Sequence, residues 1–86
     1  MDTDNTILIT GGGSGIGRGL AESFHALGNK VIIAGRRPEP LEEVTRANPG
    51  IISAALDIGE PSAIRDFAAE IIARHPDLNV LIYIRP

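Results

Sequence analysis

The sequence predicts an α/β domain: half of a doubly wound fold, with a parallel sheet of about four strands and helices on both faces. Short runs of apolar and β-branched residues alternate with helical patterns along the chain, and the connections are short. A glycine-rich turn follows the first run directly. Because helical crossovers join parallel strands, we expect the strand order 3-2-1-4 and a ligand at the switch between strands 1 and 4.

Four apolar runs read as buried parallel strands, since they are continuous rather than alternating. They cover residues 6–10, 30–35, 51–56 and 79–84. Three helical faces separate them, and prolines suit the first turns of the second and third. The predicted faces are Ile16, Leu20, Phe24 and Leu27; Leu41, Val44 and Ala47; and Ile64, Phe67, Ala68 and Ile71.

Composition and length bound the class of protein. The chain has 86 residues, a net charge of −3 and 43% hydrophobic residues, which is typical of one small globular domain. Residues 1–86 fit about one half of a dinucleotide-binding domain, so we expect a single, incomplete domain. The mild acidity favours neither nucleic acid nor membrane as a partner, and no cysteine is present. The polar start of the chain is unlike a signal peptide, so we expect a cytoplasmic protein.

The turn after the first strand has the composition of an anion site. Its glycines let the backbone take positive φ and let a ligand approach closely, and the following helix start offers unpaired N–H groups. Neither G-x-G-x-x-G nor a P-loop fits, because Arg18-Gly19 stands where a P-loop needs Lys-Ser/Thr. The pattern T-G-x-x-x-G-x-G does fit, as Thr10, Gly11, Gly15 and Gly17. A plain strand-to-helix turn is the alternative.

This pattern resembles the short-chain dehydrogenase/reductase family, a Rossmann-fold family that binds NAD or NADP. The resemblance implies that Gly11 makes the turn, Gly15 lies near the pyrophosphate and Gly17 lets the helix pack closely on the sheet. Ser14 donates its hydroxyl to a phosphate or holds the turn. The cofactor-binding loop implied in this way comprises Gly11, Gly13, Ser14, Gly15, Ile16 and Gly17.

The end of the second strand indicates which cofactor is preferred. NAD-binding folds place an acid there to hold the ribose 2′-OH, whereas this chain has Gly35 followed by Arg36 and Arg37. A guanidinium pairs with the 2′-phosphate of NADP, so we predict NADP as the cofactor. In the family resemblance Arg36 matches a 2′-phosphate contact directly and Arg37 less so. Two solvated loop arginines are the alternative.

Asp57 and Ile58 follow the third strand. In the family resemblance the acid reaches the adenine amino group and the next residue covers the ring. An aspartate that caps the following helical region explains the same position equally well.

The resemblance extends to Ile82 and then stops. The family continues with Asn-Asn-Ala-Gly, whereas residues 83–86 read Tyr-Ile-Arg-Pro. The family's catalytic Ser and Tyr-x-x-x-Lys have no counterpart, because Tyr83 has no lysine after it and the only lysine is Lys30. We therefore assign no catalytic residue and no metal ligand. We expect an NADP(H)-binding segment of a short-chain oxidoreductase, catalytically incomplete; a non-catalytic nucleotide-sensing module is the alternative.

The predicted fourth strand also suggests how the chain assembles. Residues 80–84 are apolar and no charge interrupts them, so the strand would leave an unprotected sheet edge. We expect a homo-oligomer formed through this edge, or a complementing chain that completes a split assembly.

Overall fold

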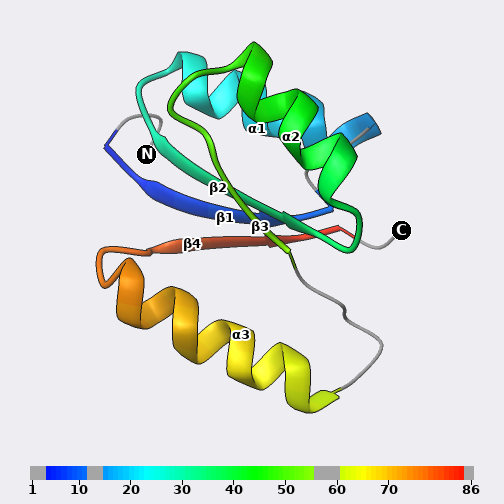
Figure 1. The fold of residues 1–86 in the computed structure, drawn as a ribbon. Coiled ribbons are helices and arrows are strands. Elements are labelled where there is room, and N and C mark those ends of the chain that lie inside the picture. The colour runs from blue at the N-terminus through cyan, green and yellow to red at the C-terminus, as the bar shows by residue number, and fades with distance from the viewer. Residues whose placement is uncertain (1–3, 12–14, 56–60, 85–86) are drawn as a thin grey trace.

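The computed structural model describes residues 4–11, 15–55 and 61–84 (Figure 1). Its elements, in order, are β1 (Thr6–Thr10), α1 (Gly15–Ala26), β2 (Lys30–Gly35), α2 (Pro38–Ala47), β3 (Ile52–Ala55), α3 (Pro61–Arg74) and β4 (Val80–Tyr83). The strands pair in parallel in the order β3-β2-β1-β4, which confirms the predicted order. Helices α1 and α2 lie on one face of the sheet and α3 lies on the other (Figure 1).

Two strands are shorter than the sequence predicts. β3 begins at Ile52 rather than Ile51, because the Ile51 N–H still closes the preceding turn by donating to the Asn48 carbonyl at 3.1 Å. β4 covers residues 80–83 of the predicted 79–84. The boundaries of β1 and β2 agree with the prediction.

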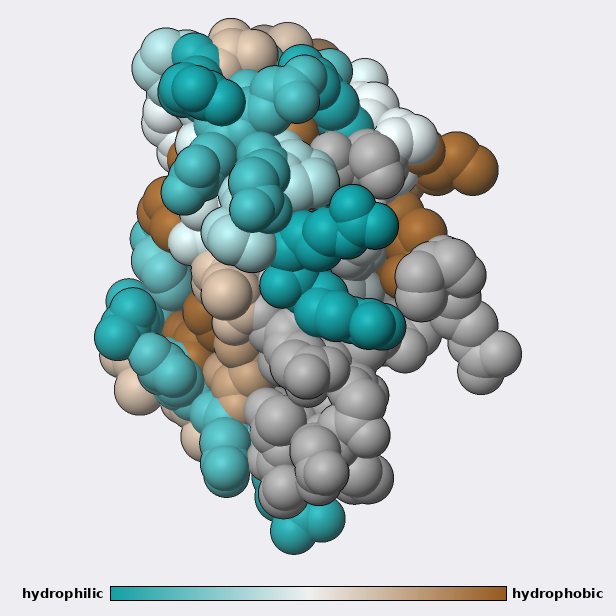
Figure 2. Space-filling view, turned by 45° about the vertical axis from the view of Figure 1, so that its right-hand side comes forward, coloured by the Kyte–Doolittle hydropathy of each residue, from teal (hydrophilic) through white to brown (hydrophobic). Residues whose placement is uncertain are grey.

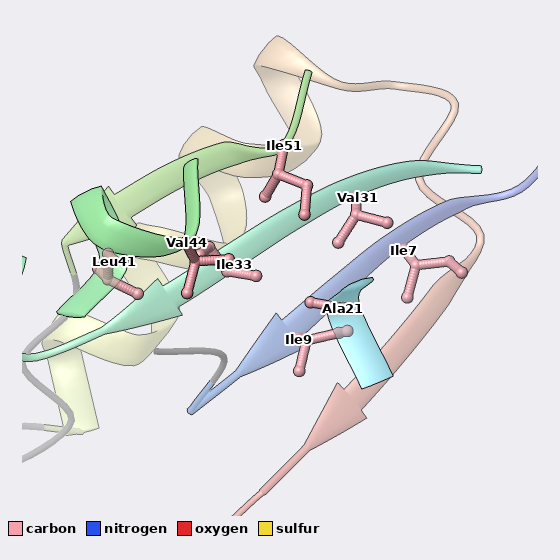
Figure 3. Packing of buried hydrophobic residues seen from close by; sticks show 8 residues of the cluster. All are labelled: Ile7, Ile9, Ala21, Val31, Ile33, Leu41, Val44 and Ile51. Atoms are coloured by element: carbon pink, nitrogen blue, oxygen red, sulfur yellow. The ribbon is translucent and has the colours of Figure 1, made fainter. Parts of the chain in front are cut away.

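The larger core lies between the sheet and the α1–α2 layer. Ile7, Ile9, Val31 and Ile33 point from β1 and β2 toward Ala21, Leu41 and Val44, with Ile51 beside them (Figure 3). A smaller core on the opposite face joins Leu8, Ile32 and Ala34 to Ile71 of α3. Side chains of β1 and β2 are therefore buried on both faces, which explains why these strands read as continuous apolar runs.

The buried face of α1 differs from the predicted stripe. Gly17 and Ala21 are its buried residues, whereas Ile16 is 77% exposed and Leu27 is 50% exposed. Leu20 and Phe24 are half-buried and pack at the margin of the core. Small residues let a helix axis lie close to a sheet. The side of α1 that faces the sheet therefore carries Gly17 and Ala21 rather than the largest apolar residues. On the other two helices, Ala47 and Ala68 belong to the predicted apolar faces but are exposed.

Asparagine side chains tie together the strand starts at the amino edge of the sheet. Asn79 Oδ1 accepts from the Thr6 N–H at 2.8 Å, and its Nδ2 donates to Asn5 Oδ1 at 2.8 Å. Asn29 Oδ1 accepts from the Asn5 N–H at 3.0 Å, and the Thr6 hydroxyl donates to Asp77 at 2.7 Å. These bonds fix β1, β2 and β4 in register at the edge opposite the glycine turn. No helix in the described ranges has the length and hydropathy that a bilayer crossing requires.

Candidate functional site

The carboxyl ends of β1, β2 and β4 meet at one edge of the sheet. Thr10 is in register with Ala34 of β2 and with Tyr83 of β4, so the three strands finish side by side. Helices α1 and α2 both start at this edge (Figure 1). In parallel α/β sheets, ligands bind outside the carboxyl ends of the strands at the point where the strand order reverses. β1 stands at that point, because its neighbours are β2 and β4.

Gly11 makes a turn that is held by both neighbouring strands. Its φ is +77°, and its N–H donates to the Ala34 carbonyl at 2.8 Å. A Cβ at this position would lie 3.1 Å from the Ile84 carbonyl oxygen and 3.4 Å from the Ile84 Cβ. The Thr10 hydroxyl accepts from the Ile84 N–H at 3.1 Å and anchors the same segment. Both the backbone angle and the lack of space therefore favour glycine at residue 11.

The first turn of α1 faces the same edge. Gly15 is exposed at φ +59°, Ile16 is exposed, and Gly17 is buried. No acidic residue stands in this turn, so no carboxylate of the helix competes for its N–H groups. Gly13 and Ser14 lie outside the described residues, so their predicted roles stay predictions.

Arg36 and Arg37 lie where β2 ends and α2 begins. Both are exposed, and Arg37 is the N-cap residue of α2 with extended backbone (φ −102°, ψ 128°). Within the described ranges neither guanidinium has a carboxylate partner, although Arg18, Lys30 and Arg74 each do. The bond from the Gly11 N–H to the Ala34 carbonyl brings the end of β2 beside the glycine turn. The edge thus has two exposed cations next to a helix start.

Arg18 has a structural role that is not predicted from the sequence. Its Nε lies 3.4 Å from Glu22 Oε2 and its Nη1 lies 3.1 Å from Glu43 Oε1, so it joins α1 to α2. Asn48 Nδ2 donates to the same Glu22 oxygen at 2.7 Å. The hydrogen bond to Glu43 raises the pKa of Arg18, and the hydrogen bond from Asn48 lowers the pKa of Glu22. The i,i+4 spacing of Arg18 and Glu22 is visible in the sequence, whereas the contact with Glu43 is not.

Asp57 and Ile58 fall outside the described residues, so the structure does not place them. Figure 2 brings the carboxyl edge forward and shows hydrophilic side chains gathered over the α1–α2 layer on this side of the molecule. Strand order, glycine turn and helix start together define the nucleotide-binding class of doubly wound α/β sheets.

Comparison with known proteins identifies the family within this class. The family model for short chain dehydrogenases matches residues 5–83, and the chain belongs to that family. Members of the family are oxidoreductases that use nicotinamide dinucleotides.

Individual relatives agree with this assignment. An uncharacterized oxidoreductase of Bacillus subtilis (strain 168), DltE, is 40% identical over 80 residues, which are 93% of this chain and 32% of DltE. The solved citronellol catabolism dehydrogenase AtuB of Pseudomonas aeruginosa PAO1 has a TM-score of 0.81 at 38% identity, over 92% of this chain and 35% of its own. A 3-ketoacyl-(acyl-carrier-protein) reductase of Brucella melitensis, solved with NADH, has a TM-score of 0.78 at 28% identity over 90% of this chain and 32% of its own. The chain thus spans about a third of the length of these relatives.

Proposed function

We propose that residues 1–86 form an incomplete dinucleotide-binding domain, the part of a short-chain oxidoreductase that binds the adenosine-phosphate end of NADP(H). The observation that carries this proposal is the pair of exposed arginines at the end of β2, beside the Gly11 turn and without carboxylate partners among the described residues.

The proposed ligand contacts follow from positions along the carboxyl edge. The glycine turn and the start of α1 bind the pyrophosphate through backbone N–H groups. Arg36 pairs with the 2′-phosphate, and Arg37 supplies a second positive charge. Exposed Ile16 gives the cofactor an apolar contact at the helix start. The full proposed set is Gly11, Gly13, Ser14, Gly15, Ile16, Gly17, Arg36, Arg37, Asp57 and Ile58.

The chemistry at the end of β2 favours NADP over NAD. A carboxylate there would accept a hydrogen bond from the ribose 2′-OH and repel a 2′-phosphate. Residue 35 is instead a glycine, and a Cβ added to it would lie 3.4 Å from Leu41 Cδ2. A guanidinium binds phosphate through paired, charge-assisted hydrogen bonds. One such contact contributes about 1.5–3 kcal/mol, which is roughly a ten- to hundredfold gain in affinity.

Titration of NADPH and NADH against the wild type and Arg36→Ala, followed by nucleotide fluorescence, tests the proposal. We expect the wild type to prefer NADPH, and Arg36→Ala to lose most of that preference while NADH binding changes little. Arg46→Ala is the matched control, because Arg46 is exposed in the last turn of α2 and its loss changes the net charge equally. Equal wild-type affinities, or the same loss in both variants, would refute the assignment.

The arrangement of tyrosine and lysine supports binding without hydride transfer. Tyr83 ends β4 at the carboxyl edge, whereas Lys30 begins β2 at the amino edge and lies 3.8 Å from Asp77. Lys30, the only lysine in the sequence, therefore lies at the opposite end of the strands from residue 83, and the family's Tyr-x-x-x-Lys pair has no counterpart in these residues. The same observation favours the second candidate function, a nucleotide-sensing module that binds without chemistry.

We also propose that the chain associates with a second copy through β4. This strand is the last in the sheet order, and no described strand pairs with its outer edge. Leu81 is in register with buried Leu8 yet is 64% exposed, so the row of apolar side chains ends open to solvent. Residues 79–84 include no charge, and two copies paired across a two-fold axis would therefore meet without repulsion.

A further inference from the structure

Four polar side chains form a seam between α1 and α2: Arg18, Glu22, Glu43 and Asn48. Arg18 contacts a carboxylate on each helix, at 3.4 Å to Glu22 and 3.1 Å to Glu43. Asn48, the C-cap residue of α2, donates to Glu22 at 2.7 Å and to the Val44 carbonyl at 3.0 Å. The seam therefore links the start of α1 to the middle and the end of α2.

The two helices joined by this seam carry the two halves of the proposed NADP(H) site. α1 begins at the glycine turn, with Arg18 in its first turns. α2 begins directly after Arg36 and Arg37, and Arg37 is its N-cap residue. A shift or rotation of α2 against α1 therefore changes the position of both arginines relative to the phosphate-binding turn. Buried Leu41 and Val44 hold α2 on the sheet, but apolar contacts are non-directional. The polar seam therefore limits small rotations of α2.

We propose that Arg18 is a positioning residue: by bridging Glu22 and Glu43 it holds Arg36 and Arg37 where they can bind the 2′-phosphate of NADP(H). The inference rests on the proposed function. Arg18 itself is not assigned to the phosphate, because two carboxylates already occupy its guanidinium and its side chain is only 30% exposed. Glu43 is 66% exposed, so its bridge is a weak one and its effect on affinity is about two- to fivefold.

The change in NADPH affinity caused by Glu43→Gln has one sign if Arg18 acts by positioning and the opposite sign if only the local charge matters. If only the local charge mattered, Arg18→Gln would weaken binding of the anionic cofactor and Glu43→Gln would strengthen it, with the double variant near the wild type. If the bridge positions the arginines, each single variant weakens NADPH binding by a similar factor. The double variant then loses as much NADPH affinity as each single variant does, so the two effects neither add nor cancel.

The experiment is a double-mutant cycle that measures the ratio of the dissociation constants of NADH and NADPH at fixed ionic strength. We expect Arg18→Gln, Glu43→Gln and the double variant each to lower this ratio about two- to fivefold. NADH binding alone should hardly change. Glu42→Gln is the matched control, since Glu42 neighbours Glu43, is exposed and has no ion pair among the described residues. Urea unfolding of each variant shows that the fold is kept.

Failure of this inference is distinguishable from failure of the proposed function. If the wild type shows no preference for NADPH, the proposed function is wrong. If the wild type prefers NADPH but Glu43→Gln keeps or increases that preference, the arginine pair binds the cofactor and the positioning role of Arg18 is refuted. A loss of the same size in Glu42→Gln refutes it as well.

Discussion

Replacing Gly11 by alanine tests how tightly the carboxyl edge is built. Two separate costs arise at this residue. The backbone has φ +77°, where an L side chain is strained by about 1–2 kcal/mol. The added Cβ would also lie 3.1 Å from the Ile84 carbonyl oxygen and 3.4 Å from its Cβ, atoms that move only with the backbone. Overpacking of this kind costs about 1–3 kcal/mol, so we expect a total loss of roughly 2–5 kcal/mol.

Two other glycines separate these costs. Gly28 has φ +94° but nothing within 4 Å of its ideal Cβ, so Gly28→Ala carries only the backbone cost of about 1–2 kcal/mol. Gly19 lies inside α1, has no positive φ and also has open space around its Cβ. Gly19→Ala should therefore stabilise the chain by about 0.5–1 kcal/mol, because alanine loses less conformational freedom than glycine in a helix.

Urea unfolding followed by far-ultraviolet circular dichroism measures the three differences in the free energy of unfolding. The expected order of stability is Gly19→Ala, wild type, Gly28→Ala and then Gly11→Ala. A domain of this size has about 5–15 kcal/mol in total, so the loss at Gly11 should be large and clear. If Gly11→Ala and Gly28→Ala lost the same amount, the close approach of Ile84 to the turn would not constrain residue 11, and our reasoning would be wrong.

The 86 residues alone should give no reductase or dehydrogenase turnover at the NADPH absorbance band, and turnover abolished by Arg36→Ala would contradict this. The hydrogen bond from Thr6 lowers the pKa of Asp77 below its ordinary value. Its contribution to stability is therefore present above the pKa of the unfolded chain and is lost as pH falls through the lower, folded-state pKa. Asp77→Asn should flatten this part of the acid slope in urea midpoints, and an unchanged slope would count against the bond. Sedimentation at micromolar concentration should show that the wild type self-associates and that Leu81→Lys does not. Ile72→Lys, at an exposed position of α3, is the control and should still self-associate. A wild-type monomer at all concentrations would exclude pairing through β4.

The strand order and the position of the glycine turn could both be predicted from the amino-acid sequence. Both depend on local sequence patterns. A strand buried on two faces needs a continuous apolar run, as in residues 30–35, and two parallel neighbouring strands need a connecting helix in the sequence between them. The positive φ of Gly11 follows from the same local chemistry, because few other residues accept it. The assignment of Arg36 to the cofactor rests on the chemistry of a guanidinium at the end of the second strand and on the family resemblance, and that of Asp57 rests on the resemblance; both stay predictions.

The partners of the charged side chains, in contrast, became known only from the folded structure, for the residues that it describes. The i,i+4 spacing of Arg18 and Glu22 is local, but the contact of Arg18 with Glu43, 25 residues away, is not. Arg36 has no carboxylate partner among the described residues. The family resemblance predicts close packing at Gly17, but the exposure of Ile16 and Leu27 was not predicted, because the rotation of α1 depends on how closely its axis can approach the sheet. The asparagine contacts between Asn5 and Asn79 join the two ends of the chain. Such contacts depend on distances that exist only after the strands have paired, so no periodicity in the sequence reports them.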